Sequence, residues 1–189
     1  NSEPGRLDRP YLMGLTLRES IAVALLAGGI IAQQSIRIPM QLPGHRGLIW
    51  VTLLVIARLY TGRRWTATLL GLLSGTLISV LGIAGSGIFG GIPYAVVGFV
   101  LDLLLLALPR AGKYFWSMAP LAMVAHVSKL SVQYVEGRAL GVGAQYILAG
   151  LIYPFWTHLL FGAIAGGLGW LIASRLPHSA LRRAAATTP

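Results

Sequence analysis

The sequence has no cysteine and very few charged residues for its length. Of its 189 residues only 11% are Asp, Glu, Lys or Arg, whereas 56% are hydrophobic and the mean hydropathy is +0.73. The missing cysteine excludes disulfides, thiolate chemistry and cysteine metal sites. Because a soluble domain carries about a quarter charged residues, too few polar side chains are available here to cover a water-exposed surface. The composition therefore predicts an integral membrane protein.

Acidic residues are especially scarce, so that 15 Lys and Arg against 5 Asp and Glu give a formal net charge of +10. In a soluble protein such an excess would suggest nucleic-acid binding. Here the basic residues lie mostly between apolar runs, and no basic stretch is interleaved with aromatic residues. We interpret them as charges that set the topology beside lipid headgroups, and we expect membrane lipids rather than nucleic acid as partners.

Six apolar stretches are candidates for membrane-spanning helices. They cover about residues 15–36, 47–60, 65–82, 92–108, 115–135 and 153–173. The second is shorter than the roughly 20 residues that a spanning helix needs. Residues 144–152 are interpreted as an interfacial or re-entrant piece, because Pro154 follows them, although they could also be part of the last helix. The predicted fold is an all-α bundle of about six transmembrane helices over residues 15–175, with tails at 1–14 and 176–189.

Six spans place most of the basic residues on one side of the bilayer. Only Arg37, Arg46 and Arg138 fall on the other side, and Lys129 lies inside a span. Loops rich in Lys and Arg stay cytoplasmic, so both termini are predicted to be cytoplasmic in a multi-pass protein of the cell membrane. The three outer segments are longer and rich in Gly and Pro, which favours a functional site at the outer face. The predicted inner set is Arg6, Arg9, Arg18, Arg58, Arg63, Arg64, Arg110, Lys113, Arg175, Arg182 and Arg183.

Four ionisable residues, Asp102, His126, Lys129 and His158, lie inside predicted spans, where a charge is costly and needs an explanation. Estimated from a helical rise of about 1.5 Å per residue, they form one band in the outer half of the bilayer or near its midplane. The spacing of His126, Lys129 and Gln133 predicts that they share one helical face. The band predicts a polar pocket for an anionic or hydrogen-bonding solute, or a structural ion pair of Asp102 with Lys129 or His126. The two are compatible.

The loop before the second span adds further candidates to this site. Its two prolines restrict the backbone, which suits a lid over a pocket, although its basic groups could equally contact lipid phosphates. Aromatic residues at the start of the last span could stack on a flat ligand, but Trp and Tyr are also enriched at membrane interfaces. The predicted substrate-binding set is Arg37, Gln41, His45, Arg46, Trp50, His126, Lys129, Gln133, Tyr153, Trp156 and His158.

Catalytic and metal chemistry have little support in the sequence. The four histidines include no pair at i, i+4 spacing, and Asp102 is the only carboxylate away from the end of a predicted span, so no acid–base pair of carboxylates can be built. There is no Gly-x-Ser-x-Gly elbow, and the Gly-Ser-Gly at residues 85–87 lacks the lysine of a phosphate loop. We therefore expect no enzymatic activity, no metal and no cofactor.

Small residues recur at four-residue spacing in three of the predicted spans. The first span carries Ala24, Gly28 and Ala32, and the third and sixth carry glycine pairs at 71 and 75 and at 162 and 166. Such stripes let helix backbones approach closely. Packing within the bundle is the expectation for the third and sixth spans, whereas the first stripe could equally face a partner protein.

Several of these features occur together in one known family. They are a chain near 190 residues with six predicted spans, the stripe Ala24-x-x-x-Gly28-x-x-x-Ala32, and the Pro- and Gly-containing loop after it. Two segments add to the likeness, Leu70-Gly-Leu-Leu-Ser-Gly75 and His158-Leu-Leu-Phe-Gly-Ala-Ile-Ala-Gly-Gly-Leu-Gly169. In this pattern the chain resembles the substrate-binding S components of energy-coupling factor (ECF) vitamin transporters.

The resemblance implies a binder of a small vitamin-like solute, with its site near the outer face beneath the first loop. The first-span stripe would dock on a transmembrane coupling subunit, and two ATPase subunits would supply energy, because this chain has no Walker motif. The basic candidates favour a solute that carries a carboxylate or phosphate. Two other functions stay open, namely an assembly or scaffold subunit of a larger membrane complex and a small membrane enzyme acting on lipid-linked substrates.

Overall fold

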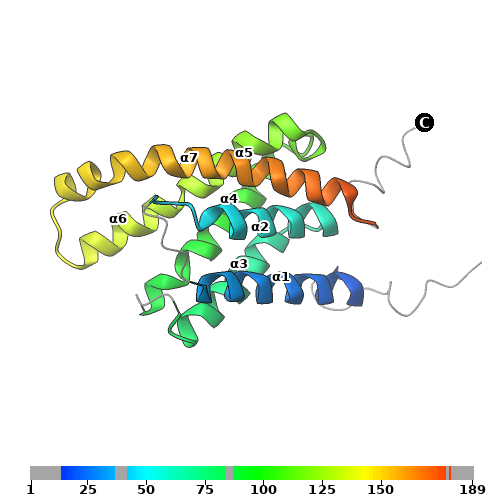
Figure 1. Cartoon of the computed structure of the whole chain (residues 1–189), viewed down its shortest axis with the longest axis horizontal. Helices are drawn as coiled ribbons and strands as arrows, with labels where there is room; N and C mark the ends of the chain where they lie inside the picture. Colours follow the sequence, from blue (N-terminus) through cyan, green and yellow to red (C-terminus); the bar gives the residue numbers. More distant parts are fainter. Residues whose placement is uncertain (1–13, 37–41, 84–86, 178, 180–189) are drawn as a thin grey trace, which may run out of the picture.

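The computed structural model describes residues 14–36, 42–83, 87–177 and 179. These residues form helices and turns without a β-strand, which confirms the predicted all-α fold (Figure 1). The elements are α1 (Leu17–Ser35), α2 (Gly47–Thr61), α3 (Thr66–Val80), the 3-10 helix η3 (Gly87–Gly90), α4 (Ile92–Ala107), the 3-10 helix η4 (Ala111–Lys113), α5 (Phe115–Val127), α6 (Lys129–Ala139) and α7 (Ala144–Arg175).

The first four helices begin and end within two residues of the predicted spans, but the fifth predicted span is not one helix, and the helix of the sixth begins earlier than predicted. The fifth breaks at Ser128 into α5 and α6, and the sixth belongs to one continuous helix, α7, of 32 residues. Residues 144–152 are therefore part of α7 and not a separate re-entrant piece. Pro154 removes one backbone hydrogen bond without ending the helix, because the residues after it pack closely against α5 and α2.

Glycines determine how closely neighbouring helices pack. A methyl group on Gly71 would lie 2.2 Å from the backbone oxygen of Tyr94, and one on Gly75 would lie 2.3 Å from that of Gly91. These contacts join α3 and α4 in an antiparallel pair. Gly162 approaches Met123 in the same way, where α7 runs antiparallel to α5. The prediction that the glycines of the third and sixth spans pack inside the bundle is confirmed.

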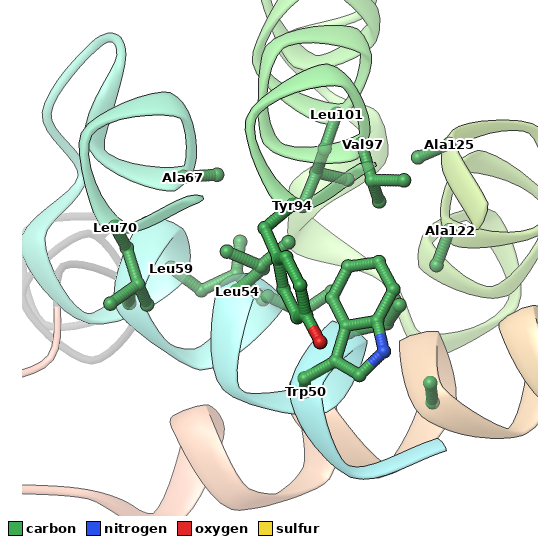
Figure 2. Close-up of a cluster of buried hydrophobic side chains, with 14 of the residues drawn as sticks. Trp50, Leu54, Leu59, Ala67, Leu70, Tyr94, Val97, Leu101, Ala122 and Ala125 are labelled. Atoms are coloured by element: carbon green, nitrogen blue, oxygen red, sulfur yellow. The ribbon is translucent and has the colours of Figure 1, made fainter. Parts of the chain in front are cut away.

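The helix α2 lies at the centre of the bundle and runs parallel to α7. The hydroxyl of Thr52 lies 3.3 Å from the carbonyl oxygen of Ala165, and Gly169 meets Val55 one turn further along. Ten of the fifteen residues of α2 are buried. Figure 2 shows the core around it, in which Trp50 and Tyr94 lie side by side among aliphatic residues of α2, α3, α4 and α5.

One end of the bundle, here called the basic end, gathers the start of α1, the α2–α3 turn, the α4–α5 turn and the end of α7. Arg63 of the α2–α3 turn forms an ion pair with Glu19 of α1, 3.7 Å apart. Gly112 of η4 packs against Leu59 of α2 and Leu105 of α4. The start of α2 and the α6–α7 connection lie at the opposite end (Figure 1).

The outer surface of the bundle is rich in large apolar side chains. Leu25 on α1 is 72% exposed, Val80 on α3 is 77% exposed and Trp116 on α5 is 76% exposed. Among the described residues, α7 is the one helix long and apolar enough to cross a bilayer by itself, whereas α2, α3 and α4 are apolar but have only 15 or 16 residues. Only 11% of the most apolar window of α7 is buried, whereas an apolar core helix of a soluble protein is mostly buried.

Candidate solute-binding site

A polar cavity of about 210 Å³, here called the Lys129 cavity, lies at the end of the bundle opposite the basic end. Four parts of the chain meet there: the end of α1, the start of α2, the η3–α4 segment and α6. The lining residues are Gln34, Arg46, Trp50, Phe89, Gly90, Pro93, Tyr94, Lys129, Val132, Gln133 and Glu136. Four predicted site residues, from two distant parts of the sequence, are thus brought together: Arg46, Trp50, Lys129 and Gln133.

The start of α2 positions Arg46 and Trp50 through a turn that needs glycine. Gly44 has φ of +83°, a conformation that other residues rarely adopt, and its carbonyl accepts a hydrogen bond of 2.8 Å from Gly47 N. A methyl group on Gly47 would lie 2.0 Å from Nε2 of His126, and one on Gly44 would lie 2.9 Å from Nδ1 of His158. The turn therefore rests directly on two imidazole rings.

Those two imidazoles form a buried layer beneath the cavity rather than part of its lining. His126 Nδ1 donates to the carbonyl of His158 over 3.1 Å, and His158 Nδ1 donates to the carbonyl of Pro154 over 2.7 Å. The ring centroids are 4.5 Å apart, and Trp50 packs edge-on against His126 at 5.6 Å. His126 hence packs against Trp50, His158 packs against His126, and neither histidine lines the Lys129 cavity.

The break between α5 and α6 directs Lys129 and Gln133 into the cavity. The hydroxyl of Ser128 donates to the carbonyl of Ala125 over 2.6 Å, and α6 begins at the next residue. Lys129 and Gln133 lie four residues apart on α6 and so share a face. His126 belongs to α5 and faces α2 and α7 instead. The prediction that His126, Lys129 and Gln133 share one helical face was therefore wrong.

The ion pair that the sequence predicted for Asp102 was also wrong. Asp102 is fully buried between α2, α3 and α4, with Oδ1 lying 2.9 Å from Nε of Arg58. Its other oxygen accepts two hydrogen bonds of 2.8 Å, from the backbone N–H and the hydroxyl of Thr68. The pair forms because the long side chain of Arg58 can extend along the bundle from the last turn of α2. Asp102 therefore contacts neither Lys129 nor His126.

The charges of the Lys129 cavity are consequently unpaired. Among the described residues, the ion pairs are Arg58–Asp102 and Arg63–Glu19. Arg46 and Lys129 have no carboxylate within 4.0 Å in that part of the chain, although Glu136 lines the same cavity. The two cations lie close enough to repel each other. A cation that is held in a largely apolar bundle without a partner is costly, so these two charges are the strongest indication of a ligand.

The remaining predicted residues lie elsewhere or outside the described residues. Arg37 and Gln41 belong to the segment that the structure does not describe. His45 lines a small apolar recess between α1, α2 and α7, and its Nδ1 lies 2.5 Å from the carbonyl oxygen of Leu42. Tyr153 and Trp156 are exposed on the outside of α7, where an aromatic side chain suits a membrane interface.

Four lining residues with polar or aromatic side chains were not predicted from the sequence. Gln34 lies near the end of the first apolar run, and Phe89 lies in a glycine-rich loop without charged residues nearby. Tyr94 is hidden in an apolar run and becomes visible only through its packing on Trp50, at 4.8 Å between ring centroids. Glu136 was assigned to a loop, although its spacing of seven residues from Lys129 is a signal that could have been used.

No family model matches this chain, and neither does any curated protein or solved structure. The function has to be argued from the cavity and from the surface of the bundle.

Proposed function

We propose that this chain is a multi-pass membrane protein that captures a small anionic solute in the Lys129 cavity, as the solute-binding subunit of an ECF-type importer. The observation that carries the proposal is the pair of unpaired cations, Arg46 and Lys129, facing a cavity in an otherwise apolar bundle. A bound carboxylate or phosphate would supply charge-assisted hydrogen bonds to both. Gln34 and Gln133 add neutral hydrogen-bonding groups to the same walls.

The surface of the bundle supports the membrane environment. Large apolar side chains are exposed on α1, α3, α4, α5 and α7, whereas a soluble monomer rarely exposes large continuous apolar patches. The 15 to 16 residues of α2, α3 and α4 extend about 22 to 24 Å, close to but below the roughly 30 Å of a hydrocarbon core. Their short turns at the basic end carry cations, which supports a cytoplasmic location for that end and an outer location for the cavity.

The small-residue stripe of α1 supports a partner in the membrane. Ala24, Gly28 and Ala32 are all exposed, and a methyl group on Gly28 would have nothing within 4 Å. Another helix could therefore approach the α1 backbone closely at this face. We propose the transmembrane coupling subunit as the occupant, with two ATPase subunits attached to it. A scaffold subunit would use the same stripe, but it would have no need for a cavity lined by unpaired cations.

Binding measurements on the purified protein test the proposal. A panel of small carboxylates and phosphates is titrated into the detergent-solubilised protein, with calorimetry as the readout. Lys129→Ala and Arg46→Ala should each weaken binding of the best ligand by about tenfold to a hundredfold, because a hydrogen bond to a charged group contributes roughly 1.5–3 kcal/mol. Lys113→Ala, at the basic end, removes the same charge outside the cavity and should bind like the unchanged protein.

Two outcomes contradict the proposal. One is that no carboxylate or phosphate in the panel binds the unchanged protein. The other is that the best ligand binds Lys129→Ala and Arg46→Ala as tightly as it binds the Lys113→Ala control, which would place its site away from the two cations.

A further inference from the structure

We infer that the solute of the Lys129 cavity is a zwitterion, with an anionic group bound by Lys129 and Arg46 and a cationic group bound by Glu136. This inference rests on the proposed function and names its substrate class. It starts from the composition of the cavity wall, which contains two cations and one carboxylate. A site built for a simple anion gains nothing from a carboxylate, because the like charge repels the ligand and disfavours its binding.

The positions on α6 show why Glu136 does not neutralise Lys129. The two residues are seven positions apart, which is about two helical turns and about 10 Å along the helix axis. They lie on nearly the same face of α6, because seven residues at 3.6 per turn return almost to the starting direction. The structure records no ion pair between them within 4.0 Å among the described residues. Opposite charges are therefore held apart along one stripe.

The contrast with the paired charges elsewhere in the bundle makes this separation informative. Asp102 and Arg58 show that the bundle pairs its buried charges directly, at 2.9 Å, when their role is structural. In the Lys129 cavity both signs of charge are present, but within the described part of the chain each lacks such a partner. A ligand that carries both signs would pair with Glu136 at one end and with Lys129 and Arg46 at the other. The same arrangement would discriminate against plain carboxylates and against plain amines.

The size of the cavity limits the solute. A volume of about 210 Å³ equals roughly seven water molecules at about 30 Å³ each, so the solute is about as large as one substituted ring or one amino acid. Trp50 and Tyr94 are almost completely buried and form part of the wall. Aromatic faces attract cations as well as flat rings. A compact zwitterion whose charges are separated by a ring or a short chain meets all of these conditions.

Matched compounds test the inference. We would use three trios of similar size: 4-(aminomethyl)benzoate, 4-methylbenzoate and 4-methylbenzylamine; 6-aminohexanoate, hexanoate and hexylamine; and phenylalanine, 3-phenylpropionate and phenethylamine. Each is titrated into the full chain in detergent. In at least one trio the zwitterion should bind at least about tenfold more tightly than its matched anion, because one hydrogen bond to a charged group contributes about that factor.

Glu136→Gln should abolish this preference. It should weaken binding of the zwitterion about tenfold or more, whereas the matched anion should bind as tightly as before or more tightly. Arg138→Gln is the matched control, because it changes a charge two residues away on α6 and outside the cavity, where Arg138 bonds the carbonyl of Val142. Because Glu136 is only partly buried, both variants should melt at the temperature of the unchanged protein, which is checked in the same samples.

The outcomes separate the inference from the proposed function. If no zwitterion binds more tightly than its matched anion, or if Glu136→Gln keeps the preference, the inference is overturned. If anions still bind in that case and Lys129→Ala weakens them, the proposed anion capture stands alone. If Lys129→Ala and Arg46→Ala leave all binding unchanged, the proposed function fails together with the inference.

Discussion

Asp102 is a fully buried acid. One of its carboxylate oxygens forms an ion pair with Arg58, and the other accepts two hydrogen bonds from Thr68. Asp102→Ala would leave the Arg58 guanidinium buried without a counter-charge. Because breaking a buried pair from one side costs about 3–5 kcal/mol, we expect the free energy of unfolding to fall by about that amount. Chemical denaturation of the purified protein in detergent measures it.

The double variant Arg58→Met/Asp102→Leu is the control for this residue pair. It removes both charges and fills the space with apolar side chains, which is often neutral for a buried pair. We expect the double variant to be more stable than Asp102→Ala. A single variant as stable as the unchanged protein would show that the ion pair has no structural role.

At the same scale, the sequence predicted which ionisable residues lie inside the bundle better than it predicted their interaction partners. Asp102, Lys129 and the two histidines were singled out because ionisable groups inside a predicted span need an explanation. Depth along a helix can be estimated from its rise, but the direction of a side chain depends on how the helices are rotated against each other. Arg58 was placed among the cytoplasmic charges, although its long side chain reaches Asp102 between the helices.

At the scale of elements, the α3–α4 contact makes a prediction about packing. Gly71→Ala would place a methyl group 2.2 Å from the backbone oxygen of Tyr94, and a backbone atom cannot move aside as a side chain can. We expect the two helices to be pushed apart, with a loss of about 1–3 kcal/mol of stability, the usual cost of overpacking. Thermal melting in detergent is the measurement.

Gly28→Ala is the matched glycine control on α1. Its methyl group would meet nothing within 4 Å, and replacing glycine by alanine inside a helix contributes up to about 1 kcal/mol. We therefore expect Gly28→Ala to melt at the same temperature as the unchanged protein or higher. Equal losses for both glycines would contradict the packing described for α3 and α4.

The sequence predicted most elements because apolar runs and turn residues alternate clearly up to residue 114. The fifth span was harder, because no glycine or proline lies between Pro120 and Gly137 to mark the break at Ser128. There the helix ends for a tertiary reason, namely that α6 leaves the line of α5 to pack against α4 and α7 and to present Lys129 to the cavity. Hydropathy records composition along the chain and cannot detect such a change of direction.

At the scale of the whole molecule, the directions of the helices agree with the distribution of charge. Gly112 packs on the ends of α2 and α4, so the α4–α5 turn lies at the same end as the α2–α3 turn. The cations Arg63, Arg64, Arg110 and Lys113 consequently share the basic end. This is the arrangement that the positive-inside rule requires for alternating spans, and under the proposed function it corresponds to a Lys129 cavity on the outer face.

Single cysteines test this orientation cleanly, because the natural chain has none. In intact cells a membrane-impermeant maleimide should label Val142→Cys, in the α6–α7 connection, whereas Lys113→Cys should be labelled only after permeabilisation.

Leu25→Cys tests whether lipid covers the apolar surface, since Leu25 is 72% exposed in the middle of α1. If lipid covers it, the reagent should fail in both conditions, because reaction needs a water-exposed thiolate. Labelling of Leu25→Cys as fast as Val142→Cys would show that water covers this apolar surface, and labelling of Val142→Cys and Lys113→Cys from one side would contradict the alternating spans.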